Sequence, residues 1–357
     1  MTAALLVAMA AVPVEAARRP SAAAAPTSLQ EVGNAFEQDR LLAQADRVAA
    51  LEQTQQSVAQ VMRGGVDADH RDAARFLSGA LDYELGHYPQ AAQAFDEAVG
   101  DGKGPFADDA SLAAIQALEA AGRDADAARE WAKWERRFPQ SPLIPAARLG
   151  QAWNAMRRGD VAAASKLLAT ASAGAPWMER NPRLMLARAT VAYLSGKPAD
   201  ALALLGPKTN GAPDTYLKAL CLDAQGSRLK AAAAFQEVAE RYPDSPLRDH
   251  ALLGKANAFL SARDFKSAAE EFARVAAKVS DPGVKAEAEL RAAGSVYLTG
   301  AVDSALTSLR TILESHPGTD VAARAQFLVG EALVAKGKPA EAIVEFNRVL
   351  SQYFQHK

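Results

Sequence analysis

Apolar and small residues in the stretch 247–282 recur with the spacing of two short helices joined by a turn. Ala268 and Phe272 stand four residues apart, so they fall on one face of the second helix. Arg263 and Asp264 mark the turn that precedes it. The apolar faces of one such hairpin cannot be buried within the hairpin itself, and the pattern therefore predicts neighbours of the same build.

Eight copies of this pattern follow one another along the chain. The turn position carries Gly86, Gly122, Gly159, Gly196, Gly226, Arg263, Gly300 and Gly337. Five residues later stands an alanine, Ala91, Ala127, Ala164, Ala201, Ala231, Ala268, Ala305 or Ala342. Nine residues after the turn stands a large apolar residue, Phe95, Trp131, Leu168, Leu205, Phe235, Phe272, Leu309 or Phe346. Seven residues before the turn, most copies have a small residue: Gly79, Ala152, Ala189, Ala219, Ala256, Ala293 and Gly330, with Ile115 as the exception.

Glycine and proline mark the ends of the helices in these copies. A glycine just past a helix end adopts the left-handed conformation that terminates the helix. Proline cannot continue a helix, and it stands seventeen residues after five of the turns, as Pro139, Pro176, Pro213, Pro243 and Pro317. The pattern therefore predicts an all-helical chain of about eight hairpins with almost no β-strand.

The framework of small residue, turn glycine, alanine, large apolar residue and proline over residues 70–354 resembles the tetratricopeptide repeat family. The resemblance implies a right-handed α-solenoid that binds proteins or peptides. Two features depart from the family pattern. Arg263 replaces a turn glycine, so we expect that turn to have another geometry. The period is 37 residues instead of about 34.

The connectors 138–142 and 242–246 place two prolines around a serine. Connectors of this kind are similar to those of bacterial envelope repeat proteins, such as the outer-membrane assembly lipoprotein of the BamD type and the periplasmic Tol–Pal-associated coordinator. The narrower resemblance implies a role in the cell envelope.

One gap between turns, from Gly196 to Gly226, has only 30 residues. Pro213 keeps its usual distance from the preceding turn, so the loss is expected in the first helix of the fifth copy or its approach. We predict a joint near residues 206–214. It divides the array into repeats 1–4 at 66–212 and repeats 5–8 at 213–357.

The N-terminal segment reads as a leader. Residues 2–14 are an apolar run of signal-peptide length, too short to span a bilayer, although no basic residue precedes it. We therefore expect a signal peptide at 1–17, a flexible Ala/Pro/Ser-rich leader at 18–28 and a periplasmic protein. If the run is not a signal, the protein is a cytoplasmic adaptor.

The two ends of the array offer surfaces for self-association. Residues 29–65 have a helical pattern and form either a pair of capping helices or a short coiled coil. At the other end, an uncapped last repeat would expose part of the face that carries Ile343, Phe346, Val349 and Phe354. The alternative is that residues 353–357 cover this face.

Charge and motifs argue against catalysis and against nucleic acid. The chain has 40 basic and 42 acidic residues and a net charge of −2, which gives no phosphate-binding surface. The single cysteine, Cys221, is expected in the core. No catalytic motif and no metal-ligand cluster is evident in the sequence. We therefore predict a protein that is not an enzyme and uses no cofactor, metal or small-molecule substrate.

The positions three and ten residues before each turn are mostly apolar or aromatic and fall nearly on one face of the first helix. In the family that this chain resembles, such positions commonly face a groove. The candidate groove residues, with one added tryptophan, are Phe76, Tyr83, Leu149, Trp153, Met156, Tyr193, Tyr216, Leu260 and Tyr297. The alternative is that this stripe is the core of the hairpins.

The function predicted from the groove is a binding scaffold of the bacterial envelope that holds a partner peptide or protein. One alternative is an accessory subunit of a cell-wall enzyme or of a secretion or outer-membrane assembly complex. A second, of a different class, is a hydrolase of the cell wall in its own right.

Overall fold

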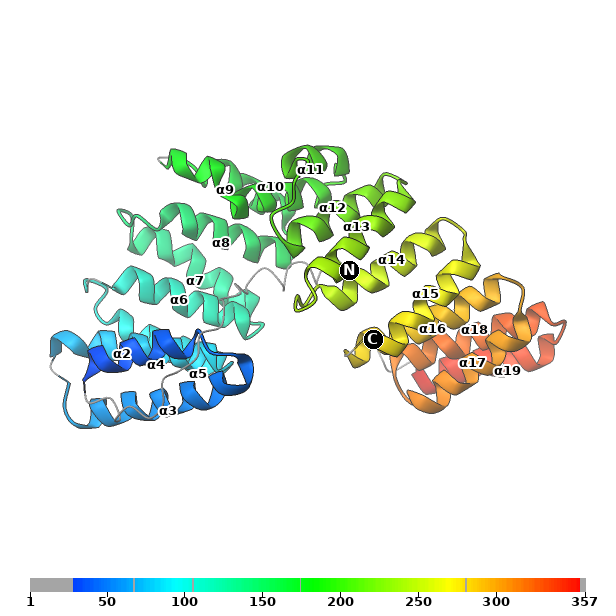
Figure 1. Ribbon diagram of the computed structural model, residues 1–357, viewed down its shortest axis with the longest axis horizontal. Helices are drawn as coiled ribbons and strands as arrows, with labels where there is room; N and C mark the ends of the chain where they lie inside the picture. The colour runs from blue at the N-terminus through cyan, green and yellow to red at the C-terminus, as the bar shows by residue number, and fades with distance from the viewer. Residues whose placement is uncertain (1–27, 67, 105, 174, 280, 354–357) are drawn as a thin grey trace. The chain divides into compact units, whose positions relative to one another are not determined.

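The computed structural model describes residues 28–66, 68–104, 106–173, 175–279 and 281–353. Within these residues the chain is all-helical and contains no strand, as the sequence predicts. The described residues form two compact units that meet in the sequence between Val191 and Ala192. Each unit is a tetratricopeptide-like stack of helices that pack in consecutive pairs (Figure 1).

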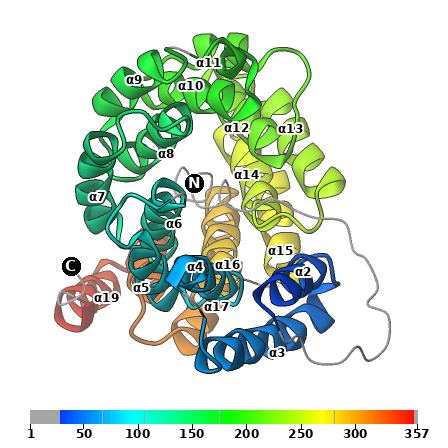
Figure 2. The same ribbon diagram turned by 90° about the vertical axis from the view of Figure 1, so that its left-hand side faces the viewer.

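The N-terminal unit begins with two helices that precede the repeats and then alternates first and second helices. Its helices are α2 (Leu29–Asp39), α3 (Gln44–Arg63), α4 (Ala68–Glu84), α5 (Tyr88–Val99), α6 (Ala107–Ala120), α7 (Asp124–Arg137), α8 (Ile144–Arg157) and α9 (Val161–Thr170), followed by the 3₁₀-helix η2 (Pro176–Arg180). In Figure 2 the first helices α6 and α8 lie on one side of this stack, and the second helices α7 and α9 lie on the other.

The boundary between the units falls inside α10 (Pro182–Leu194). The C-terminal unit then contains α11 (Pro198–Leu205), α12 (Ala212–Ala224), α13 (Arg228–Arg241), α14 (Arg248–Ser261), α15 (Phe265–Lys278), α16 (Pro282–Leu298), α17 (Val302–Ser315), α18 (Asp320–Ala335) and α19 (Pro339–Tyr353). In this unit the first helices α14, α16 and α18 pack against one another as well as against their own partners.

Seven of the eight hairpin turns share one pattern of two backbone hydrogen bonds. At Gly226, which has φ 78°, the amide donates to the Asp223 carbonyl at 2.9 Å and the next amide donates to the Leu222 carbonyl at 2.9 Å. These two bonds satisfy carbonyls that the end of a helix leaves without partners.

The turn at Arg263 has the same geometry, so the expectation of a different one was wrong. Arg263 has φ 60° and its amide donates to the Leu260 carbonyl at 3.0 Å, while Asp264 donates to the Phe259 carbonyl at 3.1 Å. The packing of the two helices and the hydrogen bonds hold an arginine in a conformation that glycine adopts at lower cost.

The hydrophobic core is divided into clusters, most of which are shared by three successive helices. One cluster joins Leu253 of α14 to Phe272 of α15 and Val284 of α16. The next joins Leu290 of α16 to Leu309 of α17 and Val329 of α18. Because every cluster takes side chains from the following hairpin, each repeat is stabilised mainly by its neighbour.

The shortening between Gly196 and Gly226 lies in a different place from the one expected. The first helix of the fifth copy, α12, keeps 13 residues, against 14 in α14. The preceding second helix, α11, has only eight residues, against 14 in α13. Gly206, with φ 68°, ends α11 early, and Pro213 lies in the first turn of α12, because proline can start a helix as well as follow one.

The predicted signal peptide at 1–17 lies outside the described residues, as does the predicted leader apart from Ser28. Helices α2 and α3 pack on each other and on α4, through a cluster that includes Phe36, Leu51 and Leu81. Among the described residues, no helix combines the length and the apolar character needed to cross a membrane.

At the other end, Ile343 and Leu350 of α19 are exposed, whereas Phe346 and Val349 are half-buried. Self-association through this face stays a prediction, and Phe354 lies outside the described residues.

Candidate functional site

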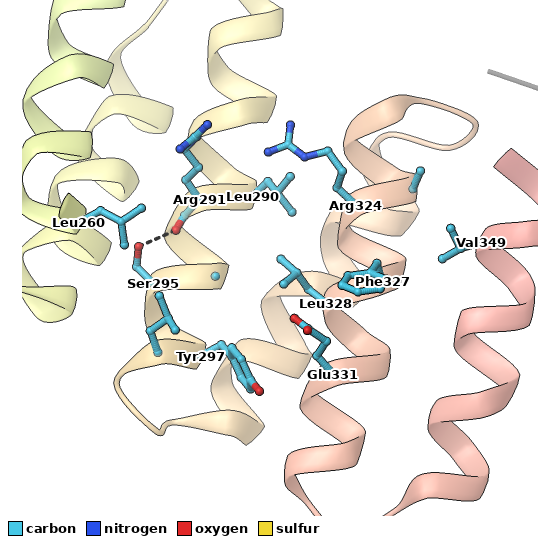
Figure 3. Close-up of a pocket in the computed structure, with 13 residues that line it drawn as sticks. Leu260, Leu290, Arg291, Ser295, Tyr297, Arg324, Phe327, Leu328, Glu331 and Val349 are labelled. Atoms are coloured by element: carbon cyan, nitrogen blue, oxygen red, sulfur yellow. Dashed lines mark hydrogen bonds between the residues drawn. The ribbon is translucent and has the colours of Figure 1, made fainter. Parts of the chain in front are cut away.

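The C-terminal unit contains an open groove formed by the first helices of three consecutive hairpins. Its volume is about 550 Å³. It is lined by Leu260 of α14, by Leu290 and Tyr297 of α16, and by Phe327 and Leu328 of α18, with Val349 of α19 at its edge (Figure 3). Most of the lining is therefore aliphatic or aromatic, and Phe327 is 48% exposed.

Small residues open the space between α16 and α18. Gly294 and Ala323 line the groove from the two helices. A Cβ atom at Gly294 would lie 3.7 Å from Cδ1 of Leu328, which is ordinary van der Waals contact. The glycine is thus not needed for the two helices to approach each other. Because it has no side chain, it leaves space that forms part of the groove.

Two arginines lie together at one end of the groove. Arg324 donates to the Glu287 carboxylate with bonds of 2.7 and 3.2 Å, and Arg291 donates to the same carboxylate and to Asn257 Oδ1. Burial of Glu287 disfavours its charged form, but the hydrogen bonds from Arg324 and Arg291 together outweigh burial and lower the pKa of Glu287. This end of the groove is basic.

The opposite end carries Tyr297 and Glu331 (Figure 3). Within the part of the chain that the structure describes, the Glu331 carboxylate has no ion pair and no hydrogen bond. A charged group in that position can meet an incoming cation without first breaking an internal contact. The groove is therefore apolar along its length and carries opposite charges at its two ends.

Of the nine residues proposed from sequence, the structure places Leu260 and Tyr297 in this groove. Sequence reasoning did not select Arg291, Arg324 or Glu331. Leu290 and Phe327 belong to the apolar series ten residues before the turn, which was the available signal for them.

The other two candidates in the C-terminal unit do not line the groove. Tyr216 is fully buried, and its ring packs edge-on against Phe235 with centroids 5.4 Å apart. Tyr193 is half-buried. Burial raises the pKa of both phenols. Tyr216 is thus a core residue, which is the alternative that its regular spacing left open.

Of the five candidates in the N-terminal unit, three are buried and two are half-buried. Leu149, Trp153 and Met156 of α8 are buried. Phe76 and Tyr83 are half-buried, and their rings contact Phe95 at 5.2 Å and Tyr88 at 5.3 Å. Leu149, Trp153 and Met156 therefore contribute to the packing between helices.

Two further features bear on chemistry. Cys221 is buried in α12, as predicted, and burial raises the pKa of its thiol to about 12. Within the described ranges, no three His, Cys, Asp or Glu side chains are arranged to hold a metal ion.

Paired helices with shared cores define an α-helical repeat protein, and family models specify the kind of repeat. A model described as a tetratricopeptide repeat-like domain matches residues 208–357. A second model, described as a tetratricopeptide repeat, matches residues 76–142 and 149–206. The chain is a tetratricopeptide repeat protein. Such repeats generally serve as non-catalytic scaffolds that bind proteins or peptides.

One solved structure supports the fold, and two others are more distantly similar. A tetratricopeptide repeat protein from Parabacteroides merdae has 17% identity and a TM-score of 0.51, and the match covers 70% of this chain and 94% of that one. Human IFIT1, solved as a dimer with PPP-AAAA, has 14% identity and a TM-score of 0.49, covering 90% and 82%. The APC/C hetero-tetramer Cut9–Hcn1 has 11% identity and a TM-score of 0.43, covering 92% and 86%. The comparison with curated proteins gives no match.

Proposed function

We propose that this protein is a non-enzymatic scaffold that holds a segment of a partner protein in the groove between α14, α16 and α18. The observation that carries the proposal is the open apolar lining of that groove, in which the Phe327 side chain is 48% exposed. Cavities of this size and apolar character are typical of sites that bury ligand side chains. A preformed surface also lowers the entropy cost of ordering the partner.

The bacterial cell envelope is the compartment we propose. The apolar run at 2–14 and the proline–serine connectors support this part of the proposal. An accessory subunit of a cell-wall enzyme, or of a secretion or outer-membrane assembly complex, would use the same groove with a different partner. A cytoplasmic adaptor is the alternative if the run is not a signal.

A pair of matched substitutions tests the groove. Phe327→Glu places a charge in the lining, and Leu229→Glu places the same charge on α13, where Leu229 is 74% exposed and outside the lining. Quantitative pull-down should show partners that Phe327→Glu loses and Leu229→Glu retains. If both variants recover the same partners as the wild type in equal amounts, this groove is not the binding surface.

Trp153→Ala is a poorer test of the groove, because Trp153 is buried and its truncation costs about 3–5 kcal/mol of stability whatever its role in binding.

Cell fractionation tests the compartment separately. Processed protein in the periplasmic fraction supports export, and full-length protein confined to the cytosol contradicts it.

A further inference from the structure

The geometry points to a particular kind of partner: an extended segment with apolar side chains between an acidic and a basic residue. This inference rests on the proposed function, because it specifies what the groove between α14, α16 and α18 holds. The acidic residue would face Arg291 and Arg324, and the basic residue would face Glu331.

The guanidinium groups of Arg291 and Arg324 at the basic end can bind a second carboxylate. The two guanidinium groups offer five N–H donors each, ten in all. With the described residues these groups make four hydrogen bonds, three to Glu287 and one to Asn257, which leaves six donors. Glu287 supplies one negative charge against two positive ones. Asp320 is 3.9 Å from Arg324, is itself mostly exposed and does not line the groove.

The distance between the two ends sets the spacing of the partner's charges. Arg324 and Glu331 are seven residues apart on one helix, which corresponds to about 10 Å along its axis. An extended chain covers about 10 Å in three residues, at roughly 3.3 Å per residue. The partner's acidic and basic residues are therefore expected three positions apart, with two residues between them on the apolar lining.

The length of the groove suits an extended segment. Four extended residues reach from one charged end to the other, whereas a helix needs about seven residues to cover the same distance of roughly 10 Å. An extended segment lying between the two walls can point its two successive core side chains to opposite sides, one toward Leu290 of α16 and the other toward Phe327 of α18 (Figure 3).

The test uses the full-length protein and three synthetic peptides with the same Leu-Phe core. One peptide has Glu before the core and Lys after it, the second has Glu at both positions and the third has Lys at both. Fluorescence anisotropy should show the mixed peptide binding about fivefold or more tightly than either of the others, since each well-placed charge-assisted contact contributes in this range.

Glu331→Lys reverses the charge of a half-exposed side chain, so the fold should be retained, which circular dichroism checks. In this variant the doubly acidic peptide should become the tightest of the three, and Glu331→Gln should bind the mixed peptide with intermediate affinity. Phe327→Glu should weaken all three peptides.

The possible failures are distinguishable. If Phe327→Glu weakens binding but the three peptides bind equally, or their order is the same in Glu331→Lys, the charge selection is wrong and the groove still binds peptides. If none of the peptides binds, or binding does not respond to Phe327→Glu, the inference and the proposed groove both fail.

Discussion

Phe235 of α13 packs directly on the backbone of Gly254 in α14. A Cβ atom at Gly254 would lie 2.7 Å from Cε1 of the Phe235 ring, a distance shorter than Cβ atoms show to other atoms in real structures. The same relationship joins Trp131 to Gly150, where the distance would be 2.8 Å. In both cases a large residue on a second helix enters a notch in the first helix of the next repeat, so the glycine sets how closely two repeats approach.

Gly254→Ala should therefore destabilise the protein by about 1–3 kcal/mol, because the added methyl group forces the Phe235 ring or the helix to move. The free energy of unfolding from urea titration measures this loss. Phe235→Leu in the same background should recover part of it, because the smaller side chain makes room for the methyl group.

Gly294→Ala is the matched control in the same unit. Its Cβ would have ordinary contact with Leu328, and alanine is a better helix former than glycine by about 1 kcal/mol. We expect unchanged or higher stability. Equal destabilisation by Gly254→Ala and Gly294→Ala would contradict the view that close packing of Phe235 explains the first effect.

Arg263→Gly should stabilise the protein by about 1 kcal/mol, because Arg263 is held in the left-handed conformation at φ 60°. The reverse change, Gly226→Arg, should cost about as much, since the space around Gly226 is open and only the backbone conformation is affected. Thermal and urea unfolding of the two variants check the pair. A destabilising Arg263→Gly would mean that the arginine side chain contributes more than its backbone costs.

Glu287 should make stability depend on pH in the acid range. The pKa of Glu287 is lower in the folded protein than its ordinary value of 4.5. The stability it contributes is therefore fully present above pH 4.5 and is lost as the pH falls through the lowered pKa. Relative to Glu287→Gln, the wild type should be more stable by roughly 1–2 kcal/mol near neutral pH. The difference should shrink below pH 4.5, and a difference that grows on acidification would contradict the assigned direction.

Much of the fold could be predicted because the same pattern of small, large apolar and turn residues recurs in eight copies along the chain. The turn at Gly226 and the pairing of small residues with large ones follow from backbone geometry and from helical spacing, which are local. The Arg263 turn could not be predicted in this way, because tertiary packing imposes a conformation that the residue itself disfavours. The shortening between Gly196 and Gly226 was assigned to the wrong place for a related reason: Pro213 can follow one helix or begin the next.

The candidate site was less predictable. Leu260 and Tyr297 could be selected by their apolar character, but the same character describes Tyr216, which is core. Whether an apolar position is covered depends on the neighbouring repeats. The opposed charges of Arg324 and Glu331 carry no signal in the repeat pattern, because they become a pair of groove ends only when α16 and α18 lie side by side.

The most direct test of the account is site-specific photo-crosslinking in living cells. A photoreactive phenylalanine analogue replaces Phe327 in the groove or Leu229 on α13, in an otherwise unchanged chain. The account predicts a discrete protein adduct from position 327 and none from position 229. It also predicts that Gly294→Met, which fills the groove from below, removes the adduct. No adduct at position 327, or an adduct that Gly294→Met leaves unchanged, would contradict the claim that this protein binds its partner in the groove.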